Sequence, residues 1–70
     1  MELKITLKAA RVNANMNQLE ASKLLEVSKK TLILWEKGEK EPTKAQKLLI
    51  SSIYNIDQKY IFFDQKTHKE

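Results

Sequence analysis

The chain has 70 residues, enough for one small domain with a single core. It has no cysteine, one glycine and one proline, which excludes disulfides and thiolate metal sites and leaves stability to packed helices and their caps. Thirteen basic against nine acidic residues give a net charge of +4, which favours an acidic partner such as nucleic acid. No apolar run approaches the roughly 20 residues that cross a membrane, and no leader suggests secretion. We therefore expect a cytoplasmic protein.

Five short helices are predicted in chain order, each preceded by a residue that can cap its N-terminus. The caps are Thr6, Asn17, Ser28, Thr43 and Asp57, and the helices cover 7–14, 18–25, 29–36, 44–54 and 58–63. Two of the caps, Asn17 with Glu20 and Thr43 with Gln46, also have the spacing of a capping box. Residues suited to ending a helix follow the first, third and fourth segments: Asn15, Gly38 and Asn55.

The ends of the chain are predicted to be less regular. Leu3 and Ile5 alternate with polar residues, so residues 1–5 can form an extended arm that pairs with 60–63 as a strand, within or between chains. Residues 64–70 are polar and are expected to fray. No repeat or linker divides the chain, which predicts one domain over 1–70 with its core in 6–63.

The helix that begins at Lys29 has two different faces. At about 3.6 residues per turn, one stripe ends in leucine and tryptophan and should face the core; it comprises Ser28, Thr31, Leu32 and Trp35. The opposite stripe comprises Lys29, Lys30, Ile33, Leu34 and Lys37. Three ammonium groups cannot be buried together without partners, so this stripe is either solvated or bound to another molecule. Its two aliphatic residues could contact thymine methyl groups or mark a protein interface.

Two helices joined by a short turn, of which the second is capped and basic on its outer face, are typical of a helix-turn-helix. The N-terminus of the second helix carries free N–H groups and partial positive charge, to which Lys29 and Lys30 add. A phosphate backbone suits that end, and a helix fits the major groove. A lysine pair by itself is more often only a solvated surface, and that alternative stays open.

At these residues the chain resembles the phage-repressor and Cro-like helix-turn-helix family, the xenobiotic-response-element (XRE) class. The resemblance runs from about Leu7 to Phe62 and includes "LKAAR", "NQLEASKLLEVS", "TLILWEKGEKEPT" and "YNIDQKYIF". The matching positions are Gln18, Val27, Ser28, Leu32, Trp35, Glu36, Gly38 and Pro42. The resemblance implies an all-α, compact five-helix, lambda-repressor-like DNA-binding domain whose second and third helices form the helix-turn-helix.

The resemblance also implies roles for individual residues. Gln18 would bind a phosphate, although a purely structural capping role is the alternative. The residues that would face the bases or the adjacent backbone are Ser28, Lys29, Lys30 and Leu34; Ile33, from the helical stripe, is a further candidate for a DNA contact. Those that would contact phosphates, or else remain ordinary surface lysines, are Lys37, Lys40 and Lys44. Arg11 and Glu36 would form a partly buried ion pair that fixes the recognition helix to the first helix.

The sequence departs from the family at three positions where glycine is usual, Asn15, Glu26 and Asn55. Asparagine tolerates a positive φ. Glu26 would take this conformation at a cost of about 1–2 kcal/mol, or the turn has another shape.

These observations predict a sequence-specific DNA-binding transcriptional regulator of the Cro/repressor type, as found in phages and prophages. It would bind double-stranded DNA as a homodimer on a two-fold operator. Candidates for the dimer interface are Tyr60, Ile61, Phe62 and Phe63. The alternative is that Ile61 and Phe62 close the monomer's own core. The rival function is a helical protein-interaction module, antitoxin-like, that binds through Ile33 and Leu34.

Catalytic chemistry is not expected. The single histidine, His68, lies in the polar tail, and one glycine cannot form a phosphate-cradling loop. No cysteine or histidine spacing suits a metal ion. We therefore expect no enzyme, no cofactor and no metal site, and no small-molecule effector is evident.

Overall fold

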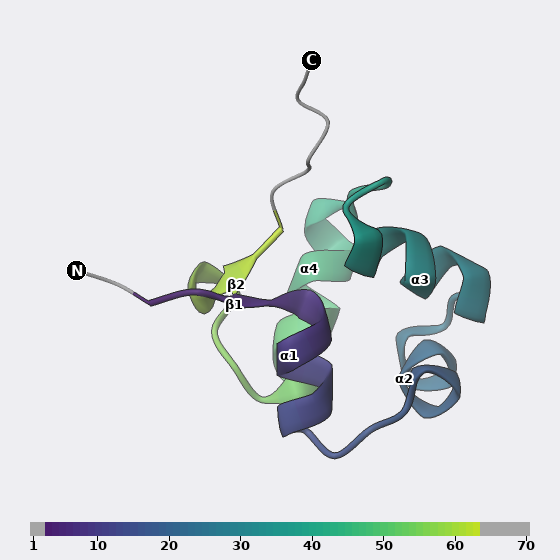
Figure 1. The fold of residues 1–70 in the computed structure, drawn as a ribbon, viewed down its shortest axis with the longest axis horizontal. Coiled ribbons are helices and arrows are strands. Elements are labelled where there is room, and N and C mark those ends of the chain that lie inside the picture. The colour runs from purple at the N-terminus through teal and green to yellow at the C-terminus, as the bar shows by residue number, and fades with distance from the viewer. Residues whose placement is uncertain (1–2, 64–70) are drawn as a thin grey trace.

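The computed structural model describes residues 3–63. Over these residues the chain forms four α-helices, one 3₁₀ turn and a pair of two-residue strands (Figure 1). In chain order they are β1 (Ile5–Thr6), α1 (Leu7–Asn13), α2 (Gln18–Leu25), α3 (Lys29–Lys37), α4 (Lys44–Tyr54), the 3₁₀ turn η1 (Gln58–Tyr60) and β2 (Ile61–Phe62). The predicted all-α class is confirmed, but the count of five helices is wrong. Among these helices none has the length and apolar content needed to cross a membrane.

Each α-helix begins at the capping residue that the sequence predicts. The four cap side chains accept a hydrogen bond from the backbone N–H three residues on, which satisfies one of the unpaired donors of the first turn. These caps are Thr6, Asn17, Ser28 and Thr43. Both predicted capping boxes are present, because Glu20 and Gln46 each bond back to the backbone N–H of their cap.

Left-handed residues lie at or just after the C-terminal end of each helix. Gly38 has a φ of 79°, and the three non-glycine residues have φ values near 60°: Asn15 at 62°, Glu26 at 60° and Asn55 at 56°. Glu26 therefore takes the left-handed conformation, which is the first of the two alternatives, although it has a Cβ. The turn between α2 and α3 thus contains a left-handed residue with a Cβ and carries the strain of that conformation.

The predicted fifth helix over 58–63 is replaced by η1 and β2. β2 pairs in parallel with β1, with Ile5 opposite Ile61 and Thr6 opposite Phe62, so the predicted pairing of the arm is confirmed within one chain. Aromatic and β-branched residues favour a strand over a helix, and the arm supplies a backbone partner that a single turn of helix lacks. The segment 64–70, for which fraying is predicted and which contains His68, lies outside the described residues.

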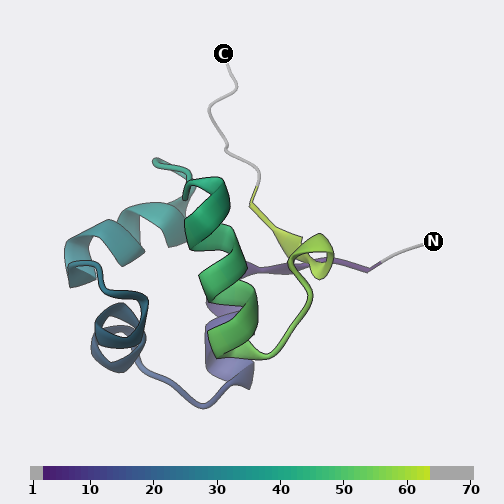
Figure 2. The ribbon, with the colours of Figure 1, turned by 180° about the vertical axis from the view of Figure 1, so that it is seen from behind.

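The core lies between the four α-helices, and α2 contributes the buried Ala21 and Leu25 and packs against both α3 and α4 (Figures 1 and 2). Leu32 of α3 and Ile50 of α4 are fully buried at its centre. Ile61 is buried and closes the core, but Phe62 is 49% exposed, so only one of the two residues has the predicted core role. Both views place β1 and β2 at the side of the molecule opposite to α2 and α3. The helix-turn-helix and the aromatic C-terminal strand are thus separate surfaces.

Candidate nucleic-acid interface

The inner face of α3 anchors it to the rest of the protein. Leu32 and Trp35 are buried in the core, as the sequence predicts, and Val27 is half-buried just before the helix. Thr31 is half-buried too, whereas Ser28, assigned to the same stripe, is exposed because it caps the helix. The position of α3 is therefore set by two large apolar side chains, and its other face is left for solvent or a ligand.

The outer face of α3 is basic. Lys29, Lys30 and Lys37 are all exposed. The first turn of α3 contains no acidic residue, whereas the first turn of α2 contains Glu20. The partial positive charge of the α3 N-terminus is thus reinforced by two ammonium groups and not cancelled within that turn. This end of α3 has the electrostatic character that a phosphate backbone requires.

Ile33 and Leu34 do not stand fully exposed among the lysines, as the stripe predicted. Both side chains are half-buried. With about 3.6 residues per turn they lie on either side of the line through Lys30 and Lys37. The apolar surface on this face is smaller than the sequence suggested, and the lysines dominate it.

Two further lysines follow α3 in the loop and at the start of α4. Lys40 and Lys44 are exposed, and the first turn of α4 contains no acidic residue. The loop also carries Glu39 and Glu41, of which Glu41 is engaged in an ion pair with Lys47 at 2.5 Å. The basic character of α3 therefore continues past its C-terminus into α4.

Gln18 and Ser28 each already form structural hydrogen bonds. The Gln18 side-chain amide donates to Glu36 Oε1 at 3.2 Å. Ser28 Oγ accepts from the Thr31 backbone N–H at 3.1 Å and donates to Thr31 Oγ1 at 2.9 Å. Each side chain keeps hydrogen-bonding capacity beyond these partners, since a primary amide has two N–H groups and a hydroxyl has two lone pairs.

Arg11 and Glu36 form the ion pair that the resemblance implies. Arg11 Nε lies 2.7 Å from Glu36 Oε2 and Nη2 lies 3.4 Å from Oε1, with the two side chains 8% and 5% exposed. Arg11 Nη1 also donates to the Met16 carbonyl at 2.9 Å. The guanidinium and carboxylate thus connect α1, the α1–α2 loop and α3 beneath the basic face.

Two buried polar atoms, Trp35 Nε1 and Tyr54 Oη, have no hydrogen-bond partner among the described residues. Burial raises the pKa of Tyr54 to about 12; the charge of Glu36 acts in the same direction and that of Arg11 opposes it. The Tyr54 phenol is therefore held neutral beside the ion pair.

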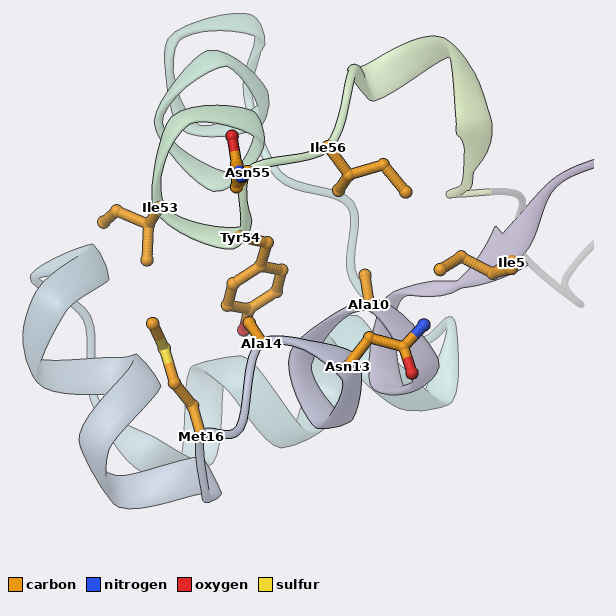
Figure 3. A pocket seen from close by; sticks show the side chains of 9 residues that line it. All are labelled: Ile5, Ala10, Asn13, Ala14, Met16, Ile53, Tyr54, Asn55 and Ile56. Carbon is orange, nitrogen blue, oxygen red and sulfur yellow. The ribbon is translucent and has the colours of Figure 1, made fainter.

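A pocket of about 470 Å³ lies between α1 and α4 (Figure 3). Its lining includes Met16, Ile53, Ile56 and the ring of Tyr54, with Asn13 and Asn55 as the polar members. None of its lining side chains carries a charge, so it is unsuited to a phosphate. The sequence did not predict this pocket because it forms only when residues distant in the chain pack together.

Several exposed apolar residues were also missed by the sequence reading. They are Val12, Leu19, Leu24 and Leu48. Their positions around the helices could have predicted this exposure. Leu48, for instance, is two positions from the buried Ile50 and so points away from the core. Among the described residues, no three His, Cys, Asp or Glu side chains are close enough together to hold a metal ion.

Comparison with known proteins places the chain in a family. A family model described as helix-turn-helix matches residues 7–57, which is most of the chain and includes all four α-helices. No curated protein and no solved structure shows significant similarity.

Proposed function

The chain belongs to the XRE-type (Cro/C1-type) helix-turn-helix family, whose members are DNA-binding regulatory domains, and from this premise we propose that it is a sequence-specific transcriptional regulator of the Cro/repressor type. The observation that carries the proposal is the outer face of α3, where Lys29, Lys30 and Lys37 are exposed and the first turn has no carboxylate. In this proposal residues 1–70 act as one domain with its core in 6–63. Its cytoplasmic location stays a prediction.

On DNA, α3 would lie in the major groove with its N-terminus toward the bases. The side chains assigned to bases or the adjacent backbone are Ser28, Lys29, Lys30, Ile33 and Leu34. Those assigned to phosphates are Gln18, Lys37, Lys40 and Lys44. The phosphate contacts would supply most of the affinity and the base contacts the specificity. The exposed Lys37, Lys40 and Lys44 support this division, because they place ammonium groups along the end of α3, the following loop and the start of α4.

One module of this size reads only a few base pairs, so we propose a homodimer on two half-sites. Phe62 and Tyr60 are 49% and 38% exposed, and such aromatic surface supports a protein contact at the β2 side of the molecule. Ile61 is buried in the monomer and is not available for this contact.

Selection of bound sequences from random duplex DNA tests both proposals together. We expect enrichment of a motif with two-fold symmetry and half-sites about one helical turn apart. Enrichment of a single half-site would keep the DNA-binding function and overturn the dimer. No enrichment of any motif would overturn sequence-specific binding.

The rival protein-interaction module would use Ile33 and Leu34. Their half-burial reduces the apolar surface that they offer to a protein partner, and this supports the proposal of DNA as the partner of α3. Binding of DNA and of a protein would differ in salt dependence, since counterion release makes DNA binding fall steeply with ionic strength.

A further inference from the structure

The carboxylate of Glu36 is shared between two helices other than its own. Oε2 accepts from Arg11 of α1, and Oε1 accepts from the Gln18 side-chain amide of α2 at 3.2 Å. Oε1 also lies 3.4 Å from Arg11 Nη2. Glu36 itself belongs to α3, so one buried side chain joins all three helices that surround the turn.

These bonds fix the direction of the Gln18 amide. A carboxylate can only accept hydrogen bonds, so the side of the amide turned toward Glu36 must be its NH₂ group. One of the two N–H bonds is used by Glu36, and the second N–H remains. The hydrogen bond to Glu36 thus orients the amide.

The start of α2 is held from the other side by the same ion pair. Arg11 Nη1 donates to the Met16 carbonyl at 2.9 Å, and Met16 directly precedes Asn17, the residue that caps α2. The capping box between Asn17 and Glu20 then sets the first turn. Both the backbone just before α2 and the first side chain of α2 are therefore tied to one buried pair.

We propose that Glu36, supported by Arg11, is a positioning residue that orients the Gln18 amide so that its second N–H donates to a DNA phosphate. This inference rests on the proposed function, in which Gln18 contacts a phosphate. In this mechanism the ion pair does more than hold α3 to α1: it removes the rotational freedom of a DNA-contacting side chain before DNA arrives, and such preorganisation raises affinity.

The test uses a variant that removes the carboxylate without leaving a buried charge. Arg11→Met/Glu36→Met replaces the pair by apolar side chains of similar length, an exchange that buried ion pairs often tolerate. Gln18→Met removes the amide itself. The matched control is Lys47→Met/Glu41→Met, which makes the same change at the exposed ion pair. Neither double substitution alters the net charge.

With the duplex that the selection enriches, Gln18→Met should bind about tenfold more weakly, the value of roughly one hydrogen bond to a charged group. Arg11→Met/Glu36→Met should lose a similar factor while melting at or above the wild-type temperature. The triple variant should be no worse than either. Losses that multiply to about a hundredfold, or wild-type affinity in Arg11→Met/Glu36→Met, would overturn the positioning role.

A phosphate scan separates positioning from a general structural effect. Neutral methylphosphonate is placed at one phosphate of the duplex at a time. At one position it should weaken the wild type about tenfold, yet leave both Gln18→Met and Arg11→Met/Glu36→Met unaffected. A tenfold loss by the pair variant at that same position would contradict the inference.

One measurement needs neither a variant nor DNA. In the free wild-type protein, side-chain scalar couplings and amide relaxation of Gln18 should report a single rotamer. Rotamer averaging would overturn the positioning role even where DNA binding is intact. Absence of DNA binding with a single rotamer would instead overturn the proposed function and the phosphate contact with it.

Discussion

Two ion pairs of similar length lie in different regions of this protein. Arg11 and Glu36 meet at 2.7 Å beneath the helix-turn-helix, with side chains only 8% and 5% exposed. Lys47 and Glu41 meet at 2.5 Å where α4 follows the loop after α3, with side chains 22% and 52% exposed. The first pair connects residues 25 positions apart, the second residues six apart.

The comparison shows that separation between charges says little about their role. At the exposed pair, water screens the attraction and competes for both partners. At the buried pair, removal of either residue leaves the other charge buried without its partner. Loss of Glu36 also removes the acceptor of the Gln18 amide, and loss of Arg11 removes a donor to the Met16 carbonyl. The buried pair is therefore a structural junction, whereas the exposed pair is a minor surface contact.

The largest effect should come from breaking the buried pair on one side. Arg11→Ala leaves the Glu36 carboxylate buried without its cation, and we expect a loss of about 3–5 kcal/mol in the free energy of unfolding. Urea unfolding measures it, with the exposed Lys23→Ala as control. Equal midpoints for the two variants would show that the buried pair is not a junction.

A smaller effect, of opposite sign, is expected at Tyr54. Its buried hydroxyl has no hydrogen-bond partner among the described residues, so Tyr54→Phe should raise stability by up to about 1–3 kcal/mol at neutral pH. A destabilised Tyr54→Phe would mean that the hydroxyl has a partner.

The same residue predicts a pH dependence. The folded-state pKa of Tyr54 is raised to about 12 from an ordinary value of 10.0, so the folded protein holds this proton more tightly than the unfolded chain. The stability that this protonated phenol contributes to the folded state is fully present below pH 10 and is lost as pH rises through 12. Wild type should therefore lose more stability than Tyr54→Phe between pH 9 and 11. Parallel losses would contradict this.

The turn between α2 and α3 offers a smaller gain. Glu26 has a φ of 60°, a conformation that costs a residue with a Cβ about 1–2 kcal/mol. Because glycine also adds entropy to the unfolded chain, Glu26→Gly should stabilise by only about 0.5–1 kcal/mol. Thermal unfolding measures this gain, with Glu26→Ala, which keeps the Cβ, as the control. Equal melting temperatures for Glu26→Gly and Glu26→Ala would show that the turn is unstrained.

The smallest effect should come from the exposed pair. Glu41→Gln replaces a charged side chain that is 52% exposed by a neutral one, so we expect the free energy of unfolding to change by less than about 1 kcal/mol. Lys47 would keep its contact over the ring of Phe63, at 5.0 Å from the ring centroid. A loss as large as that of Arg11→Ala would erase the distinction between the two regions.

Local chemistry made most of the fold predictable. The caps at Asn17 and Thr43 determine where α2 and α4 begin, and each acts within a few residues, so the sequence alone reveals it. The end of the chain was harder: whether 58–63 continues as helix depends on a partner strand more than fifty residues away, which local propensity cannot report.

In the candidate site, too, features within one helix were predictable from the sequence and contacts between helices were not. Helical spacing was enough to place Lys30 and Lys37 on the outer face of α3. It did not reveal that Ile33 and Leu34 are half-buried, because that depends on the neighbours of α3. The bond between Gln18 and Glu36 joins two helices and has no signature in either.

DNA binding through α3 is tested most directly by a salt titration on the enriched duplex. Lys29→Ala/Lys30→Ala removes two lysines from α3, and Lys8→Ala/Lys23→Ala removes two exposed lysines from α1 and α2 to which no contact with DNA or a partner is assigned. The wild type should bind more weakly as salt rises, and the α3 variant should lower the slope of log affinity against log salt by about two. The control variant should keep the wild-type slope. Binding that ignores salt, or equal slopes in all three proteins, would contradict DNA recognition by α3.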